Sequence, residues 1–268
     1  MTDRTAPTKP AATKPAAAAQ AWPWGPVAGI LIVLAIFFGA QIIGQIIVSI
    51  YPALQGWSEG RATDWLTSNA AVQFLYILAV EALTMWMLYM VLRSRKQHFR
   101  DLGLLRPRLR DLGTTLAAYP VYFILNAVAT LGAAALFHLD TEQRQQTGFE
   151  TATSTTDLAL TFVSLVILPP IVEEIVMRGF LFTSLKKGMP VIRAAIVTSI
   201  IFAIAHLQFG SGAPLLWLAA IDTFVLSLVL CYLRQRTGSL WAGIGLHALK
   251  NGLAFFVLFI APRLGWQI

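Results

Sequence analysis

The sequence is poor in charged residues and in cysteine. Only 12% of its 268 residues are charged and 57% are hydrophobic, whereas about 25% of the residues of a typical soluble domain are charged. A soluble domain of this length could not bury so much apolar surface. Cys231 is the one cysteine, which excludes an internal disulfide framework and a metal site built from several cysteines. The low fraction of charged residues, together with the high apolar fraction, indicates a membrane protein.

Long apolar runs define the predicted architecture. Several of them reach the roughly 18–20 residues that cross a bilayer as a helix. Residues 1–24 are rich in Ala, Pro, Thr and Lys, which is typical of a disordered tail, and residues 25–268 are expected to form one transmembrane domain. We predict an all-α transmembrane bundle of about seven spans, the fourth kinked or started by Pro169 and Pro170, at residues 26–51, 70–92, 112–137, 158–182, 191–209, 214–234 and 239–261.

Basic residues are distributed unevenly between the predicted loops. Fifteen Lys and Arg residues fall on one side of the membrane, seven of them in the 93–111 loop, against three on the other side. The positive-inside rule therefore predicts a cytoplasmic N-terminus. The net charge of +7 is explained by this topology, so no nucleic-acid partner is expected. We expect a multi-pass protein of the inner (plasma) membrane, with the lipid bilayer as partner and the 93–111 loop facing anionic lipid.

Polar and ionisable side chains also lie inside the predicted spans. A charge near the bilayer centre costs at least about 2.5–3.5 kcal/mol, so such residues are expected to have partners and a function. Glu174 and Arg178 have the i,i+4 spacing of an ion pair on one helix face. The complete set is Glu81, Glu173, Glu174, Arg178, His206, Asp222, His247, Lys250 and Asn251, in which Lys250 either pairs with Asp222 or extends to the membrane surface.

Helix geometry places several of these groups at one depth. At about 1.5 Å per residue, Glu173, His206, His247 and Asn251 lie about 12–20 Å from the predicted cytoplasmic ends of their helices, which indicates a single buried site. A carboxylate with an imidazole can deprotonate a water, and a second imidazole with a carboxamide can stabilise an oxyanion. Alternatively, Glu173, His206 and His247 could ligate zinc, although the HExxH spacing of common zinc proteases is absent.

Three motifs contain these residues. EEIVMR (173–178), FAIAH (202–206) and HALKN (247–251) resemble the EExxxR, FxxxH and HxxxN patterns of the CPBP (ABI) family, which includes the type II CAAX prenyl endopeptidases and bacteriocin-processing proteins. TGSLWAGIGLH (237–247) and FRDLGLLRP (99–107) also look similar to the family. The clear resemblance covers about 158–255.

The resemblance implies a role for each motif residue and no required cofactor, with zinc kept as an alternative. Glu173 would be the general base with His206 beside it on the water, His247 and Asn251 would form the oxyanion hole, and Glu174 and Arg178 would structure the site or bind substrate.

These observations lead to one prediction and three alternatives. We predict an intramembrane endopeptidase that cleaves a membrane-anchored, prenylated or otherwise lipidated protein or peptide with an activated water. The alternatives are a zinc-dependent intramembrane metalloprotease, a bacteriocin-immunity protein that binds without cutting, and a proton-coupled carrier in which the Glu and His residues relay protons.

Overall fold

The computed structural model describes residues 21–140, 147–207 and 215–266. In this part of the chain, six helices are long and apolar enough to cross a membrane, which confirms an all-α polytopic bundle. They are α1 (Pro26–Leu54), α3 (Ala70–Ser94), α4 (Leu109–Phe137), a composite helix over Thr155–Lys186, α9 (Trp217–Thr237) and a composite helix over Trp241–Leu264. The last consists of α10 (Trp241–Phe255), η4 (Phe256–Ile260) and η5 (Ala261–Leu264).

The span expected at 191–209 is a shorter helix. α8 (Val191–Ile204) has 14 residues, which gives it a length of about 21 Å, whereas the hydrocarbon core of a bilayer is roughly 30 Å thick. Residues 208 and 209 of the expected span lie outside the described residues. A count of seven spans and a cytoplasmic N-terminus therefore stay predictions.

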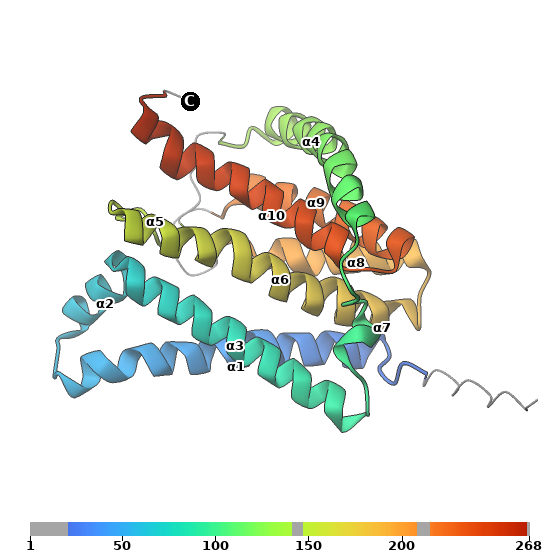
Figure 1. Ribbon diagram of the computed structural model, residues 1–268, viewed down its shortest axis with the longest axis horizontal. Helices are drawn as coiled ribbons and strands as arrows, with labels where there is room; N and C mark the ends of the chain where they lie inside the picture. Colours follow the sequence, from blue (N-terminus) through green and yellow to red (C-terminus); the bar gives the residue numbers. More distant parts are fainter. Residues whose placement is uncertain (1–20, 141–146, 208–214, 267–268) are drawn as a thin grey trace, which may run out of the picture.

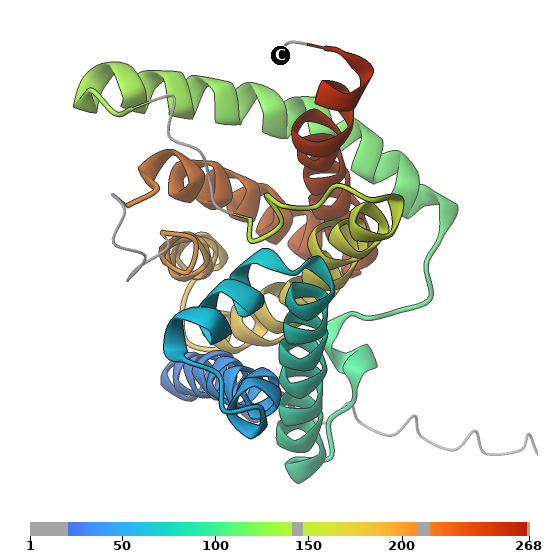
Figure 2. The same cartoon turned by 90° about the vertical axis from the view of Figure 1, so that its left-hand side faces the viewer.

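The composite helix over Thr155–Lys186 is the centre of the bundle (Figure 1). α1 and α3 pack against one side of it, and α8, α9 and α10 contact the other side. α4 lies on the outside against α9 and α10 (Figure 2). Half of the most apolar window of the composite helix is buried inside the protein, compared with 6% for α4.

The composite helix is not uniformly α-helical. Its segments are α5 (Thr155–Phe162), η2 (Val163–Ile167), α6 (Leu168–Glu174), η3 (Ile175–Leu181) and α7 (Phe182–Lys186). η2 and η3 are π-helical. Pro169 and Pro170 lie in the first turn of α6, where the missing N–H groups of proline are tolerated. η3 directly follows Glu174 and contains Arg178, and π turns of this kind are frequent at functional sites.

Contacts bring the basic loops together at one end of the bundle. Lys186 Nζ donates to Gln235 Oε1 at 2.9 Å, and Lys187 Nζ donates to the Trp22 carbonyl at 2.8 Å. The Leu240 N–H donates to the Gly103 carbonyl at 3.0 Å. The segments that follow α3, α7 and α9 therefore share one end, as the distribution of Lys and Arg predicts.

The described chain starts inside the segment expected to be a disordered tail. Residues 1–20 of that segment lie outside the described residues. Trp22 and Trp24 pack on the bundle, with ring centroids 5.6 and 5.1 Å from that of Phe180. Trp22 also donates from Nε1 to Ser184 Oγ at 3.0 Å. At the opposite end of the bundle, α2 (Glu59–Ser68) connects α1 to α3.

The outer surface of the bundle is apolar. Large exposed hydrophobic side chains follow one another along α1 and α4, among them Val27, Leu31, Phe38, Ile42, Leu116, Ile124, Val128 and Leu131. Monomeric soluble proteins rarely expose contiguous apolar patches of this extent. These faces are therefore suited to contact with lipid.

Gly103 provides a test of the packing between the basic loops. Its φ is +92°, and a Cβ there would lie 2.9 Å from the Gly238 carbonyl oxygen. We expect Gly103→Ala to lower the free energy of unfolding by about 1–3 kcal/mol because of this strain, seen as a lower thermal midpoint in detergent. Gly113→Ala in α4, where a Cβ meets open space, is the matched control and should keep or slightly raise the midpoint. Equal midpoints for the two variants would contradict the strain.

Candidate active site

A cavity of about 280 Å³ lies between the composite helix, α8, α9 and α10. Its lining includes Glu173 at the end of α6, His206 just after α8, and His247 and Asn251 on α10. The structure thus brings together the four side chains that the sequence predicts at one depth. The remaining lining residues are a mixture of apolar and polar side chains, Asp222 and Lys250 among them, so the cavity is partly polar.

Glu173 presents a carboxylate oxygen without a protein donor. Its Oε2 is buried, and no described residue donates a hydrogen bond to it. The nearest basic nitrogen in an ion-pair contact is His247 Nε2 at 3.8 Å, which is too long for a hydrogen bond. Because buried polar atoms normally have a hydrogen-bond partner, this oxygen is suited to hold a water or a substrate group.

Arg178, Glu174 and His247 form a buried chain of contacts behind the cavity wall. Arg178 Nη1 donates to Glu174 Oε1 at 2.8 Å, and the two side chains are 0% and 1% exposed. The same carboxylate oxygen lies 3.2 Å from His247 Nδ1. Since a carboxylate held by arginine can only accept, His247 Nδ1 carries the hydrogen. The predicted i,i+4 pair is therefore present, and it orients the His247 ring.

His206 is oriented by the end of its own helix. The His206 N–H bonds to the Ala203 carbonyl at 3.0 Å, which leaves the Phe202 carbonyl without its usual i+4 donor. His206 Nδ1 lies 2.8 Å from this carbonyl oxygen, so Nδ1 is the donor. In the neutral ring, Nε2 then keeps its lone pair and can accept a hydrogen bond from a water.

Phe202 packs among the site residues. Its ring centroid is 4.7 Å from that of His206 and 6.0 Å from that of His247, both edge-on. Arg178 Cζ lies 4.4 Å from the same centroid, which is cation–π geometry. The Phe202 ring therefore contacts His206, His247 and the guanidinium of the buried ion pair.

Asn251 is tied to the composite helix. Its Nδ2 donates to the Leu165 carbonyl at 2.9 Å. The residues four and five positions after Leu165 are Pro169 and Pro170, which have no N–H to offer that carbonyl. Asn251 thus satisfies a carbonyl that the two prolines leave unpaired.

Asp222, Lys250 and Tyr122 form a second polar group beside these residues. Lys250 Nζ lies 2.9 Å from Asp222 Oδ2, so the ion pair considered from the sequence is present, and both residues line the cavity. The Tyr122 hydroxyl donates to Asp222 Oδ1. Tyr122 was missed by the sequence analysis, since nothing in the pattern of α4 distinguishes this tyrosine from its neighbours.

The zinc alternative does not fit this geometry. Among the described residues, no group of three or more His, Cys, Asp or Glu side chains is arranged to hold a metal ion. Glu173, His206 and His247, the ligands of the zinc-dependent alternative, line the same cavity but do not form such a set.

Comparison with known proteins agrees with the motifs. Residues 155–253 match the family model described as "Type II CAAX prenyl endopeptidase Rce1-like", close to the predicted limits of 158–255. The match runs from the composite helix to α10 and contains all three motifs. A search of curated proteins and a search of solved structures gave no significant match. Residues 155–253 of this multi-pass membrane protein are therefore a domain of the Rce1-like type II CAAX prenyl endopeptidase (CPBP/Abi) family.

Proposed function

We propose that the chain is an intramembrane endopeptidase that hydrolyses a peptide bond of a membrane-associated or lipidated protein. The observation that carries the proposal is the shared cavity, on which a carboxylate, two imidazoles and a carboxamide from three helical segments meet. The family match supports peptidase chemistry at this place. The inner (plasma) membrane as the location and the N-terminus in the cytoplasm belong to the same proposal.

Glu173 is the general base. It takes a proton from a water whose second hydrogen is donated to His206 Nε2, and the water oxygen attacks the carbonyl carbon of the scissile peptide bond. When the tetrahedral intermediate collapses and the C–N bond breaks, Glu173 returns the proton to the leaving amine. The carboxylate oxygen without a protein donor and the Nδ1-protonated His206 ring are both suited to these roles.

His247 and Asn251 stabilise the oxyanion. Asn251 Nδ2 carries two hydrogens, of which one is used by the Leu165 carbonyl and the other remains for the substrate. Because His247 Nδ1 donates to Glu174, Nε2 donates to the oxyanion only from the imidazolium. Before Glu173 takes the proton of the water, that charge would lie between the Glu174 and Glu173 carboxylates, at 3.2 and 3.8 Å.

Glu174 and Arg178 are positioning residues in this proposal. They are almost completely buried, and neither is among the residues that line the cavity. Their contribution is to hold His247 in one orientation, as the buried carboxylate of a hydrolase triad does for its histidine.

Loss of the base tests the proposal directly. We expect Glu173→Gln to lower the cleavage rate by about 10²–10⁴-fold without unfolding, because the side chains have the same shape. Cleavage of a panel of membrane-anchored peptides by protein in liposomes, followed by mass spectrometry, measures it. Glu59→Gln on α2 is the control, since it removes an exposed carboxylate at the opposite end of the bundle from the basic loops, and it should cleave within about threefold of wild type. Full turnover by Glu173→Gln would refute the base.

Metal removal gives a second test. Since the described residues offer no ligand set, we expect cleavage to be unchanged by a chelator and the purified protein to lack stoichiometric zinc. Elemental analysis and the same cleavage assay on one sample measure both. Stoichiometric zinc together with activity lost to the chelator would overturn the metal-free mechanism.

Asn251 has two roles that can be separated. Asn251→Ala leaves the Leu165 carbonyl unpaired, which should cost about 1–3 kcal/mol of stability, and it also removes the oxyanion donor. Combining it with Pro169→Ala and Pro170→Ala restores backbone N–H groups for that carbonyl. We expect the combined variant to regain thermal stability while its activity stays low, relative to the two proline substitutions alone. If activity returned with stability, Asn251 would act only through Leu165.

A further inference from the structure

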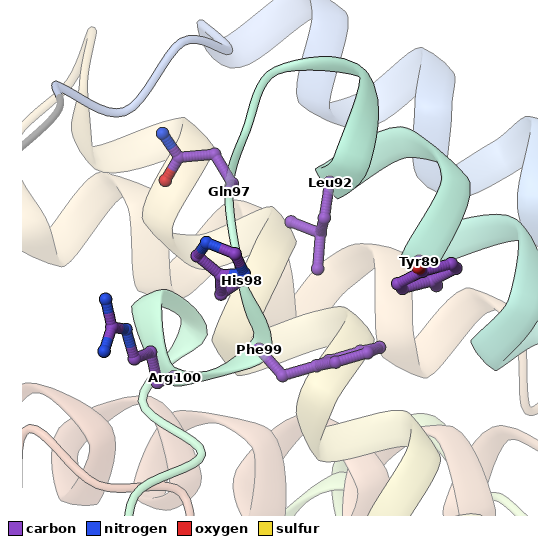
Figure 3. Close-up of a pocket in the computed structure, with 6 residues that line it drawn as sticks. All are labelled: Tyr89, Leu92, Gln97, His98, Phe99 and Arg100. Atoms are coloured by element: carbon purple, nitrogen blue, oxygen red, sulfur yellow. The ribbon is translucent and has the colours of Figure 1, made fainter.

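A second cavity, of about 450 Å³, lies between the end of α3 and η1 (Phe99–Leu102), away from the proposed active site (Figure 3). Its apolar walls are Tyr89 and Leu92 on α3 and Phe99 on η1. The Tyr89 and Phe99 rings are stacked, with centroids 6.5 Å apart and an interplanar angle of 14°. His98 and Arg100 flank it on the loop side. The cavity thus has an apolar part and a polar edge.

The edge of this cavity is basic. Arg93 Nη1 donates to the Tyr89 hydroxyl at 3.1 Å, which holds a guanidinium beside one wall. The Arg100 side chain is 78% exposed and its Nε is 3.9 Å from the Asp101 carboxylate. Residues 93–101 contain one carboxylate, Asp101, and four basic side chains, namely Arg93, Arg95, Lys96 and Arg100.

The length of α3 indicates that the cavity lies near the membrane surface. α3 has 25 residues and is therefore about 37 Å long, whereas the hydrocarbon core is roughly 30 Å thick. Its last turns, which carry Tyr89, Leu92 and Arg93, consequently reach the boundary between acyl chains and headgroups. Tyrosine is enriched at this boundary, and Tyr89 is 42% exposed.

We propose that this cavity binds an acidic phospholipid. The phosphate lies among Arg93, His98 and Arg100, and the first part of an acyl chain lies against the stacked Tyr89 and Phe99 rings. The combination of apolar walls, a basic edge and this depth matches a molecule with an anionic headgroup and a hydrocarbon chain, and basic pockets beside transmembrane helices are known to bind such headgroups. The proposal does not depend on the peptidase activity.

The bound lipid would join two parts of the molecule. α3 lies outside the matched domain, whereas η1 is fixed to that domain. Leu102 is completely buried, and its Cβ is 3.0 Å from where a Cβ on Gly179 would stand, one residue after Arg178. The loop itself is held by hydrogen bonds in both directions between His98 and Asp101, at 2.8 and 2.9 Å. A lipid between α3 and η1 therefore stabilises the packing of α3 on the domain.

The test compares two double variants with the same loss of charge. Arg93→Gln with Arg100→Gln removes the basic edge, and Arg106→Gln with Arg110→Gln removes two exposed arginines further along the basic 93–111 segment, the second of them in the first turn of α4. Full-length protein in neutral detergent is titrated with short-chain phosphatidylglycerol, phosphatidylcholine or inorganic phosphate. The thermal midpoint and the number of lipids retained in native mass spectrometry are measured.

We expect saturable binding of phosphatidylglycerol that raises the thermal midpoint of wild type and of the Arg106/Arg110 variant equally. The Arg93/Arg100 variant should bind it about tenfold more weakly or worse. Equal binding by all three proteins, or equal loss in both variants, would overturn the cavity as the site and assign binding to the general charge of the loop. An equal response to phosphatidylcholine would refute the role of the basic edge. An equal response to inorganic phosphate would show that the cavity binds free phosphate and not a lipid.

Discussion

The structure depends on an ion pair that is removed from water. Arg178 is the largest fully buried side chain among the described residues, and its Nη1 lies 2.8 Å from Glu174 Oε1. Burying such a pair costs several kcal/mol per ion before their attraction is counted, and well-packed apolar residues are often as stable. Stability alone therefore does not account for the pair. What the pair provides is a fixed negative charge at His247 Nδ1, and it requires η3, α8 and α10 to pack around Arg178 closely enough to exclude lipid and water.

The site is formed where regular helical hydrogen bonding fails. In the bilayer no water is available to satisfy a free backbone carbonyl, so side chains must do so. His206 satisfies the Phe202 carbonyl at the end of α8, and Asn251 satisfies the Leu165 carbonyl before the two prolines. In both cases the hydrogen bond that repairs the backbone also fixes the orientation of a polar side chain on the cavity. Rigid placement of the site and satisfaction of the backbone are thus achieved by the same contacts.

Much of this could be predicted from the sequence, because composition and helical spacing are local properties. Hydropathy identified the six helices that are long enough to cross a membrane, and the spacing of Glu173, His206, His247 and Asn251 indicated one layer of polar groups. The length of α8 was not predictable in this way, since apolar composition continues beyond Ile204 while the helix does not. The contact between Asn251 and Leu165 had a signal in Pro169–Pro170, which we had interpreted only as a kink or a helix start. The hydrogen bond from Tyr122 to Asp222 and the cavity beside Phe99 depend on how distant helices pack, which no local pattern records.

α8 is about 10 Å shorter than the hydrocarbon core is thick, and His206 follows directly at its end. A membrane protein with a short helix on its surface either thins the bilayer beside it or covers the gap with its own chain. Either arrangement shortens the layer of hydrocarbon that a water molecule must cross to reach the cavity. For a hydrolase, water is the second substrate, and its concentration in the bilayer interior is very low. In the hydrolase proposed above, the early end of α8 would shorten the path by which water returns to the site.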